Sequence, residues 1–179
     1  MLVPLDVELD GVRSPPGAFE DYPREEWPFV AERWATRQFG MAAAGFCPVC
    51  HGPMTSRLEP DFERIEEFDI PDAFAAVELS ECERCGETMY SNAEASVVTH
   101  PAVVAFHHDH GVDVAATPIR ELDWAVEPRS EVVGDEPLRV ESRIELGDER
   151  LAVVLDESGD VVETCRSTSG DAADPATDA

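Results

Sequence analysis

The amino-acid sequence predicts an α+β protein: an N-terminal helix leading into a cysteine-bearing β-hairpin, then a short buried helix and a C-terminal antiparallel β-meander. Three patterns predict this fold class: helical spacing of apolar residues after residue 22, two Cys-x-x-Cys pairs in hairpin-like turns beside strand-like segments, and alternating apolar and charged residues near the C-terminus. With 179 residues, 43% of them hydrophobic, the chain can bury a modest core as one domain or two small lobes.

Four regions follow from these patterns. Residues 1–22 are rich in proline and are expected to form an extended lead-in. Residues 23–95 are expected to hold the first helix and the cysteine-bearing hairpin, and residues 96–166 the second helix and the antiparallel sheet. Residues 167–179 contain no large apolar side chain, so we expect a disordered tail there.

The first helix is expected in REEWPFVAERWATRQFGMAAAG, residues 24–45. Its apolar side chains fall near one helix face, which is typical of a helix packed on a core: Trp27, Val30, Trp34 and Met41. Gly45 is a favourable helix stop, and the chain then runs directly into Cys47.

Two strands are expected next, in MTSRLEP and AFAAVELSE, on either side of the acidic insertion DFERIEEFDIPD. The short buried helix is expected in SVVTHPAVVAFHHDHG, where Pro101 suits the first turn and Gly111 ends the helix. In LRVESRIEL, residues 138–146, apolar residues alternate with arginines and glutamates. Turns after this segment lead into RLAVVLD and VVETCR, so we expect an antiparallel meander with one wet face.

Four of the five cysteines form two Cys-x-x-Cys pairs, Cys47/Cys50 and Cys82/Cys85, each with a glycine in its turn. Four converging thiolates are the tetrahedral ligand set that Zn²⁺ prefers, at Zn–S distances of about 2.3 Å. The 31 residues between the pairs fit a strand–insertion–strand excursion that returns the chain to its starting point. We therefore expect a zinc ribbon holding one structural Zn²⁺, with no coordination position open to a substrate.

Three other uses of the cysteines are less favoured. Disulfides are rare in a reducing cytoplasm, and a thioredoxin-like dithiol needs a strand–helix setting. The run CPVCH matches the motif for covalent haem, but such attachment belongs to exported proteins and would leave the second pair without a role. His51 is then expected to be a turn residue beside the metal, and the lone Cys165 a small buried hydrophobe.

Four histidines, His100, His107, His108 and His110, crowd into one short segment. A second metal site or a ligand pocket is one interpretation; the favoured one is that histidines in a last helical turn complement the negative end of the helix dipole. The sequence contains no phosphate-binding glycine loop, Gly-x-Ser-x-Gly turn or His-Glu-x-x-His motif. We therefore predict a protein that is not an enzyme, with no catalytic and no cofactor-binding residues besides the metal ligands.

The charge is strongly negative, with 39 acids against 13 bases and a net charge of −26. Every base is arginine, which suggests adaptation to a very salty cytoplasm, where repulsion between surface carboxylates is screened. No basic stripe is present to bind nucleic-acid phosphates. No apolar run approaches the roughly 20 residues of a membrane-spanning helix, and the N-terminus lacks the features of a signal peptide, so we expect a cytoplasmic protein.

The ordered set AERWATRQFGMAAAGFCPVCHGPM, CERCG, HPAVVAFHHDHGVDV and EPLRVESRIELGDERLAVVLDESGDVVE resembles the C-terminal region of haloarchaeal ArsR-type winged-helix transcription regulators. The resemblance covers about residues 14–163. It implies a zinc-ribbon-like region that accompanies a DNA-binding winged helix in that family. Residues 1–46 show no basic helix pair with a short glycine turn, so we expect no DNA reader in this chain.

The function expected from these observations is a non-catalytic, zinc-stabilised sensing or dimerisation module of a transcription regulator. The resemblance implies a second copy or a winged-helix protein as the partner, with no direct nucleic-acid binding by this chain and no membrane. The alternative is a stand-alone zinc protein that responds to metal or to oxidants through its cysteines.

Overall fold

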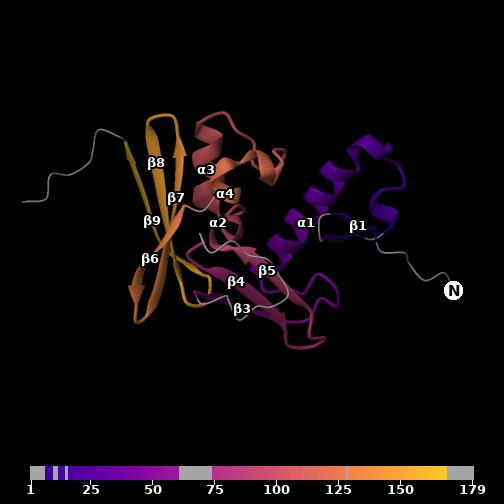
Figure 1. The fold of residues 1–179 in the computed structure, drawn as a ribbon, viewed down its shortest axis with the longest axis horizontal. Coiled ribbons are helices and arrows are strands. Elements are labelled where there is room, and N and C mark those ends of the chain that lie inside the picture. The colour runs from indigo at the N-terminus through magenta and orange to yellow at the C-terminus, as the bar shows by residue number, and fades with distance from the viewer. Residues whose placement is uncertain (1–6, 10–11, 15, 61–73, 128, 169–179) are drawn as a thin grey trace, which may run out of the picture.

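The computed structural model describes residues 7–9, 12–14, 16–60, 74–127 and 129–168. It has the predicted α+β architecture: α1 follows an N-terminal hairpin, a small sheet follows α1, and short helices lead into a C-terminal antiparallel sheet (Figure 1). The predicted acidic insertion, and the predicted tail beyond its first two residues, lie outside the described residues.

The N-terminal part contains two short strands, two 3₁₀ turns and the first helix: β1 (Val7–Leu9), β2 (Val12–Ser14), η1 (Pro16–Ala18), η2 (Arg24–Glu26) and α1 (Trp27–Ala43). The expected lead-in is therefore more structured than predicted, because β1 and β2 pair as an antiparallel hairpin. Strands of three residues are too short to show an alternating pattern in the sequence. The predicted helix is present, and Gly45, with φ of 80°, follows its end.

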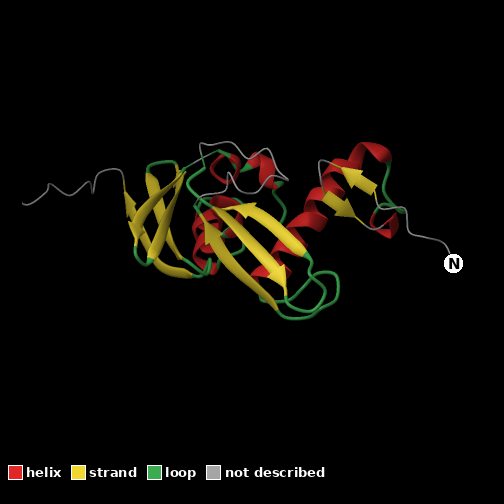
Figure 2. Ribbon diagram, turned by 60° about the horizontal axis from the view of Figure 1, so that its bottom comes forward, coloured by secondary structure: helices red, strands yellow, loops and turns green. Residues whose placement is uncertain are grey.

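The second sheet has three antiparallel strands in the order β3-β4-β5: β3 (Met54–Glu59), β4 (Val77–Cys82) and β5 (Thr88–Asn92). Figure 2 shows this sheet between the N-terminal hairpin and the C-terminal sheet. The first two strands were predicted, but β5 was not. Its sequence, TMYSN, carries polar residues at three of five positions and gives no apolar alternation.

Short helices connect this sheet to the last one: α2 (Ala93–Ser96), α3 (Pro101–Asp109), η4 (Ile119–Glu121) and α4 (Asp123–Val126). The predicted short helix is α3, which begins with Pro101 in its first turn. Gly111, with φ of 74°, lies just beyond the end of α3, as expected.

The C-terminal sheet has four antiparallel strands in the order β6-β7-β8-β9: β6 (Ser130–Asp135), β7 (Leu138–Leu146), β8 (Glu149–Asp156) and β9 (Val161–Thr168). The predicted meander supplies the last three strands, and β6 is an unpredicted fourth. Strand β9 includes the first two residues of the predicted tail.

The main hydrophobic core lies where α2, α3 and α4 cover one face of the C-terminal sheet (Figure 1). The alternating pattern correctly identifies the inward side of β7 and β8. Fully buried side chains of the sheet and the helices meet here: Val140, Ile144, Val153, Leu155, Val103 and Phe106.

Glu78 is a buried carboxylate at the joint between the two larger sheets. It lies on β4, and the backbone of Gly159 in the β8–β9 turn approaches so closely that an added Cβ would lie 3.2 Å from the Glu78 carboxyl carbon. A backbone hydrogen bond of 2.9 Å from Leu58 to Glu157 joins the same two regions. Burial raises the pKa of Glu78, although hydrogen bonds from nearby serine side chains lower it in part.

Replacing Glu78 with glutamine is expected to increase the free energy of unfolding at pH 7 by on the order of 1 kcal/mol, because the buried charge is removed. A carboxyl whose pKa is raised by folding stabilises the native state only when it is protonated, and this contribution is lost as pH rises from the unfolded pKa through the folded one. The stability difference between E78Q and wild type should therefore shrink toward pH 4. Urea unfolding at several pH values tests this, with the exposed Glu81→Gln as the matched control.

Candidate metal centre

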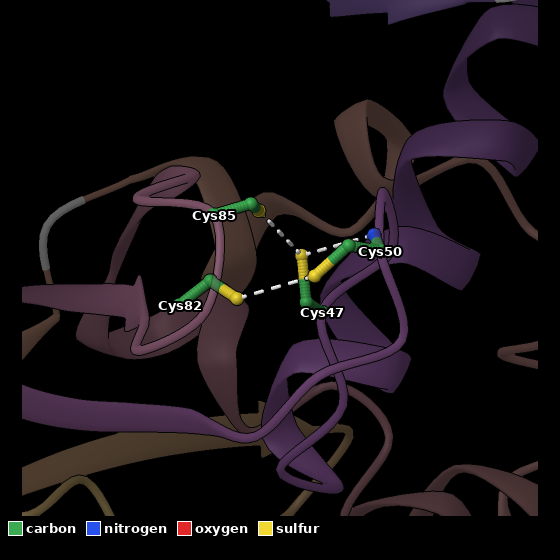
Figure 3. A group of neighbouring side chains, drawn as sticks. All are labelled: Cys47, Cys50, Cys82 and Cys85. Carbon is green, nitrogen blue, oxygen red and sulfur yellow. Dashed lines mark hydrogen bonds between the residues drawn. The ribbon is translucent and has the colours of Figure 1, made fainter.

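Two turns bring the four predicted cysteines together (Figure 3). The first cysteine turn, residues 47–52, connects α1 to β3; the second, residues 82–87, connects β4 to β5. The antiparallel pairing of β3 with β4 places Met54 opposite Cys82, so the two turns face each other at the same end of the sheet.

The four sulfur atoms form a compact group, all within 4.8 Å of one another. The Sγ atoms of Cys47 and Cys85 are 3.7 Å apart, and those of Cys50 and Cys82 are 3.5 Å apart. A tetrahedron with Zn–S bonds of about 2.3 Å has edges of about 3.8 Å. The spacing therefore fits a metal bound by four sulfurs, and it is far longer than the ~2.05 Å of a disulfide bond.

Backbone amides point at the sulfurs from within the two turns. The Cys47 sulfur accepts N–H groups from Val49 at 3.4 Å and Cys50 at 3.5 Å. The Cys50 sulfur accepts from Gly52, and the Cys82 sulfur from Arg84, both at 3.4 Å. Such donors stabilise the thiolate form, which is the form that binds metal.

The backbone amides lower the pKa of these thiols, whereas the neighbouring thiols lower the pKa of Cys82 and raise that of Cys85. The backbone amide of Cys85 lowers the pKa of Cys82 to about 6, although burial opposes it. For Cys85 the backbone amide of Glu87 lowers the pKa, but the neighbouring Cys50 thiol, burial, Cys82 and Cys47 together raise it to about 12. Four thiolates therefore need a cation among them to be charged together.

The site is partly enclosed. Cys47 and Cys82 are buried, Cys50 is half-buried and Cys85 is exposed. Ala42, in the last turn of α1, packs in the same cluster as Cys47, Met54 and Cys82. The end of α1 thus packs against the four-cysteine group.

The two cysteine turns use different residues for the same bend. The residue after the second cysteine is left-handed in both: His51 has φ of 58° and Gly86 has φ of 74°. A left-handed conformation costs a non-glycine residue about 1–2 kcal/mol. Since His51 is exposed and belongs to no metal-binding group of the described residues, its role as a turn residue agrees with the prediction.

The variant His51→Gly is expected to bind as much zinc as wild type and to gain up to about 1 kcal/mol in stability, because the strained turn is relaxed. Elemental analysis and thermal unfolding measure the two effects. A loss of metal in H51G would identify His51 as a ligand after all.

Gly52 lets the two turns approach each other. A Cβ added at Gly52 would lie 2.9 Å from the Arg84 Cβ and 3.2 Å from the Cys50 sulfur. Sequence reasoning noticed this glycine only as a flexible turn residue. Gly52 is also needed because the second cysteine turn leaves no room for a side chain there. This requirement depends on tertiary structure and cannot be seen in the sequence.

Replacing Gly52 with alanine is expected to force the turns apart and to destabilise the metal-bound protein by about 1–3 kcal/mol, the usual range for overpacking. Zinc affinity, measured by competition with a chromophoric chelator, should fall accordingly. Gly17→Ala is the control, because a Cβ at Gly17 meets nothing within 4 Å. Equal zinc affinities for G52A and G17A would contradict the packing argument.

The comparisons with known proteins add one finding. The family described as Domain of unknown function (DUF7351) matches residues 6–161, most of the chain. The chain belongs to the DUF7351 family. No curated protein and no solved structure matches it.

The predicted histidine cluster is dispersed in the structure of this DUF7351 protein. His107 is fully buried; its Nδ1 bonds the Val103 carbonyl at 2.8 Å, and its Nε2 accepts the indole N–H of Trp124 at 2.9 Å. Burial lowers the pKa of His107, so the ring is a neutral link between α3 and α4. Sequence reasoning missed Trp124 as its partner.

The other histidines in this segment have separate places. His110 bonds the Phe106 carbonyl through Nδ1 at 2.8 Å, and its Nε2 lies 3.1 Å from a Glu149 carboxylate oxygen. His100 caps the start of α3, accepting the Ala102 N–H, and His108 is exposed. Within the described part of the chain, the histidines join no group that could hold a metal.

Two further observations concern residues outside the metal centre. Cys165 is exposed on the edge strand β9, so the prediction that it is a buried hydrophobe is wrong. The alternating pattern of the sequence does not show that β9 is the last strand of the sheet.

Among the described residues, no helix is long and apolar enough to cross a membrane.

Proposed function

We propose that this DUF7351 protein holds one structural Zn²⁺ through Cys47, Cys50, Cys82 and Cys85. The observation that carries the proposal is the compact group of four sulfurs, because a tetrathiolate site leaves no coordination position for water or substrate. Bound zinc would neutralise the thiolates and fix the two turns. It would thereby hold the end of α1 against the β3-β4-β5 sheet.

We further propose that the protein is a non-catalytic regulatory module of a transcription regulator, serving in sensing or dimerisation. The resemblance of residues 14–163 to the C-terminal region of ArsR-type regulators supports this role. The acidic charge also favours it over direct DNA reading, since phosphate contacts need clustered bases.

The two parts of this proposal are tested separately. Elemental analysis of the purified protein should give one zinc per chain. A comparison of transcripts between wild-type cells and cells lacking the gene should reveal a defined set of deregulated genes, whereas the purified chain alone should give no sequence-specific gel shift in molar KCl. An unchanged transcript profile would overturn the regulatory role without affecting the zinc assignment.

A second candidate function is a redox-responsive zinc protein, and the exposure of Cys85 favours it. Hydrogen peroxide would take two electrons from two thiolates and, with two protons from solvent, form one disulfide and two waters with release of the zinc. Zinc release by stoichiometric peroxide, reversed by dithiothreitol and zinc, supports this function. Retention of zinc at many equivalents of peroxide argues for a purely structural site.

A further inference from the structure

A shallow groove along α1 combines arginines with aromatic rings. It has a volume of about 230 Å³, and its lining includes Tyr22, Phe29, Arg33, Trp34 and Arg37; we call it the α1 groove. In Figure 1, α1 extends away from the C-terminal sheet toward the N-terminal hairpin. None of its lining residues belongs to the four-cysteine group or to the main core.

Its arginines differ from the ion-paired arginines of the described residues. Six arginines of the described residues form ion pairs with acids: Arg57, Arg120, Arg129, Arg143, Arg150 and Arg166. Arg33 and Arg37 are exposed, lie one helical turn apart, and have no acidic partner in the described part of the chain. Glu32, their nearest acid on α1, pairs with Arg120 instead. Arg24, Arg84 and Arg139 also form no ion pair among the described residues, but Arg33 and Arg37 line the same groove, so two guanidinium groups lie together there.

The groove offers hydrogen-bond donors and aromatic surface together. The Arg33 guanidinium lies 5.4 Å from the centre of the Phe29 ring, a stacked position that orients its N–H groups. The indole N–H of Trp34 is shielded from solvent and has no hydrogen-bond partner among the described residues. The two exposed guanidinium groups can reach an acceptor on another molecule, and carboxylates fit guanidinium groups best.

We propose that the α1 groove binds an acidic peptide segment of a different protein, with carboxylates at Arg33 and Arg37 and one apolar side chain against Phe29 and Trp34. The volume lies below the ~300–1,000 Å³ of pockets for drug-sized ligands, which favours a single anchoring side chain. In concentrated salt, only contacts within a few ångströms resist screening, so the apolar anchor is needed beside the charges.

A second copy of this chain and a nucleic acid are both less suitable occupants of the α1 groove. Two copies joined through their α1 grooves would place arginines against arginines. An acidic patch of one copy in the groove of the next would be a heterologous contact, which tends to extend into open chains. Nucleic acid is disfavoured because two arginines do not form the basic track that a phosphate backbone requires.

The test uses the full, zinc-loaded chain in molar KCl and a short fluorescent peptide of glutamates around one phenylalanine. The peptide should bind wild type, while the same peptide with glutamines should not. R33Q/R37Q should weaken binding about tenfold, as expected for loss of charged hydrogen bonds. The control R57Q/R150Q removes two exposed arginines elsewhere and should leave the affinity unchanged. Trp34→Phe, which removes the N–H and reduces the apolar surface of the ring, should also weaken binding.

Several results would overturn the proposal: equal binding of the acidic and amide peptides, equal affinity of R33Q/R37Q and wild type, or tighter binding of a DNA duplex that R33Q/R37Q abolishes. A dimer seen by analytical ultracentrifugation and dissociated by R33Q/R37Q would likewise assign the groove to self-association. Zinc content, measured on every variant, separates these outcomes from failure of the metal site.

Discussion

The variant Cys82→Ser is expected to lose its stoichiometric zinc and with it the fold of the β3-β4-β5 sheet. Cys82 is buried, ends β4 and accepts an N–H bond from Arg84. In small zinc domains the metal contributes about 10–16 kcal/mol of apparent folding free energy. That contribution rivals the ~5–15 kcal/mol that stabilises a whole domain.

The loss should remain partly local. The larger core between the C-terminal sheet and the short helices contains no cysteine ligand. Hydrogen exchange is therefore expected to show early loss of protection in β3, β4 and β5, with slower exchange retained in β7 and β8. Chelation of zinc from wild type should reproduce this pattern.

Cys165→Ser is the matched control, since it removes the one exposed cysteine outside the site. It should keep one zinc per chain and the wild-type melting temperature. If C82S also keeps a full equivalent of zinc, or if a chelator leaves stability unchanged, the tetrathiolate assignment is wrong.

The cluster of four cysteines could be predicted because the turns that form it are local. A Cys-x-x-Cys turn needs only a few consecutive residues, and two such turns at the ends of paired strands meet by topology. The left-handed conformation of His51 was hidden, because a histidine in the sequence gives no sign of positive φ. The need for glycine at position 52 depends on Arg84, which lies on the other turn.

Other features depend on long-range contacts that no local pattern records. Val140 and Ile144 were recognised as inward-facing from alternation alone, and they are fully buried. Glu78 would be expected in water, yet it is buried because the β8–β9 turn covers it. His107 was assigned to a helix end, and only its meeting with Trp124 explains why it is buried and neutral.

The second large effect concerns salt. Even if every arginine formed an ion pair with a different acid, 39 minus 13 would leave 26 acids without a basic partner. The Debye length grows from about 3 Å at 1 M salt to about 10 Å at 0.1 M, so neighbouring carboxylates begin to repel on dilution. The native state concentrates these charges more than the unfolded chain does, and repulsion therefore favours unfolding.

Dilution from about 1 M to about 0.1 M KCl is expected to lower the melting temperature by about 10 °C, which corresponds to a few kcal/mol for a chain of this size. Differential scanning calorimetry on the zinc-loaded protein measures the shift. A variant with four exposed acids replaced by amides, Glu25, Glu26, Glu121 and Glu163, should show a smaller shift because less charge is left to repel. A melting temperature that stays constant across this range, or an equal shift in the amide variant, would mean that charge repulsion does not limit stability and that the absence of lysine has another cause.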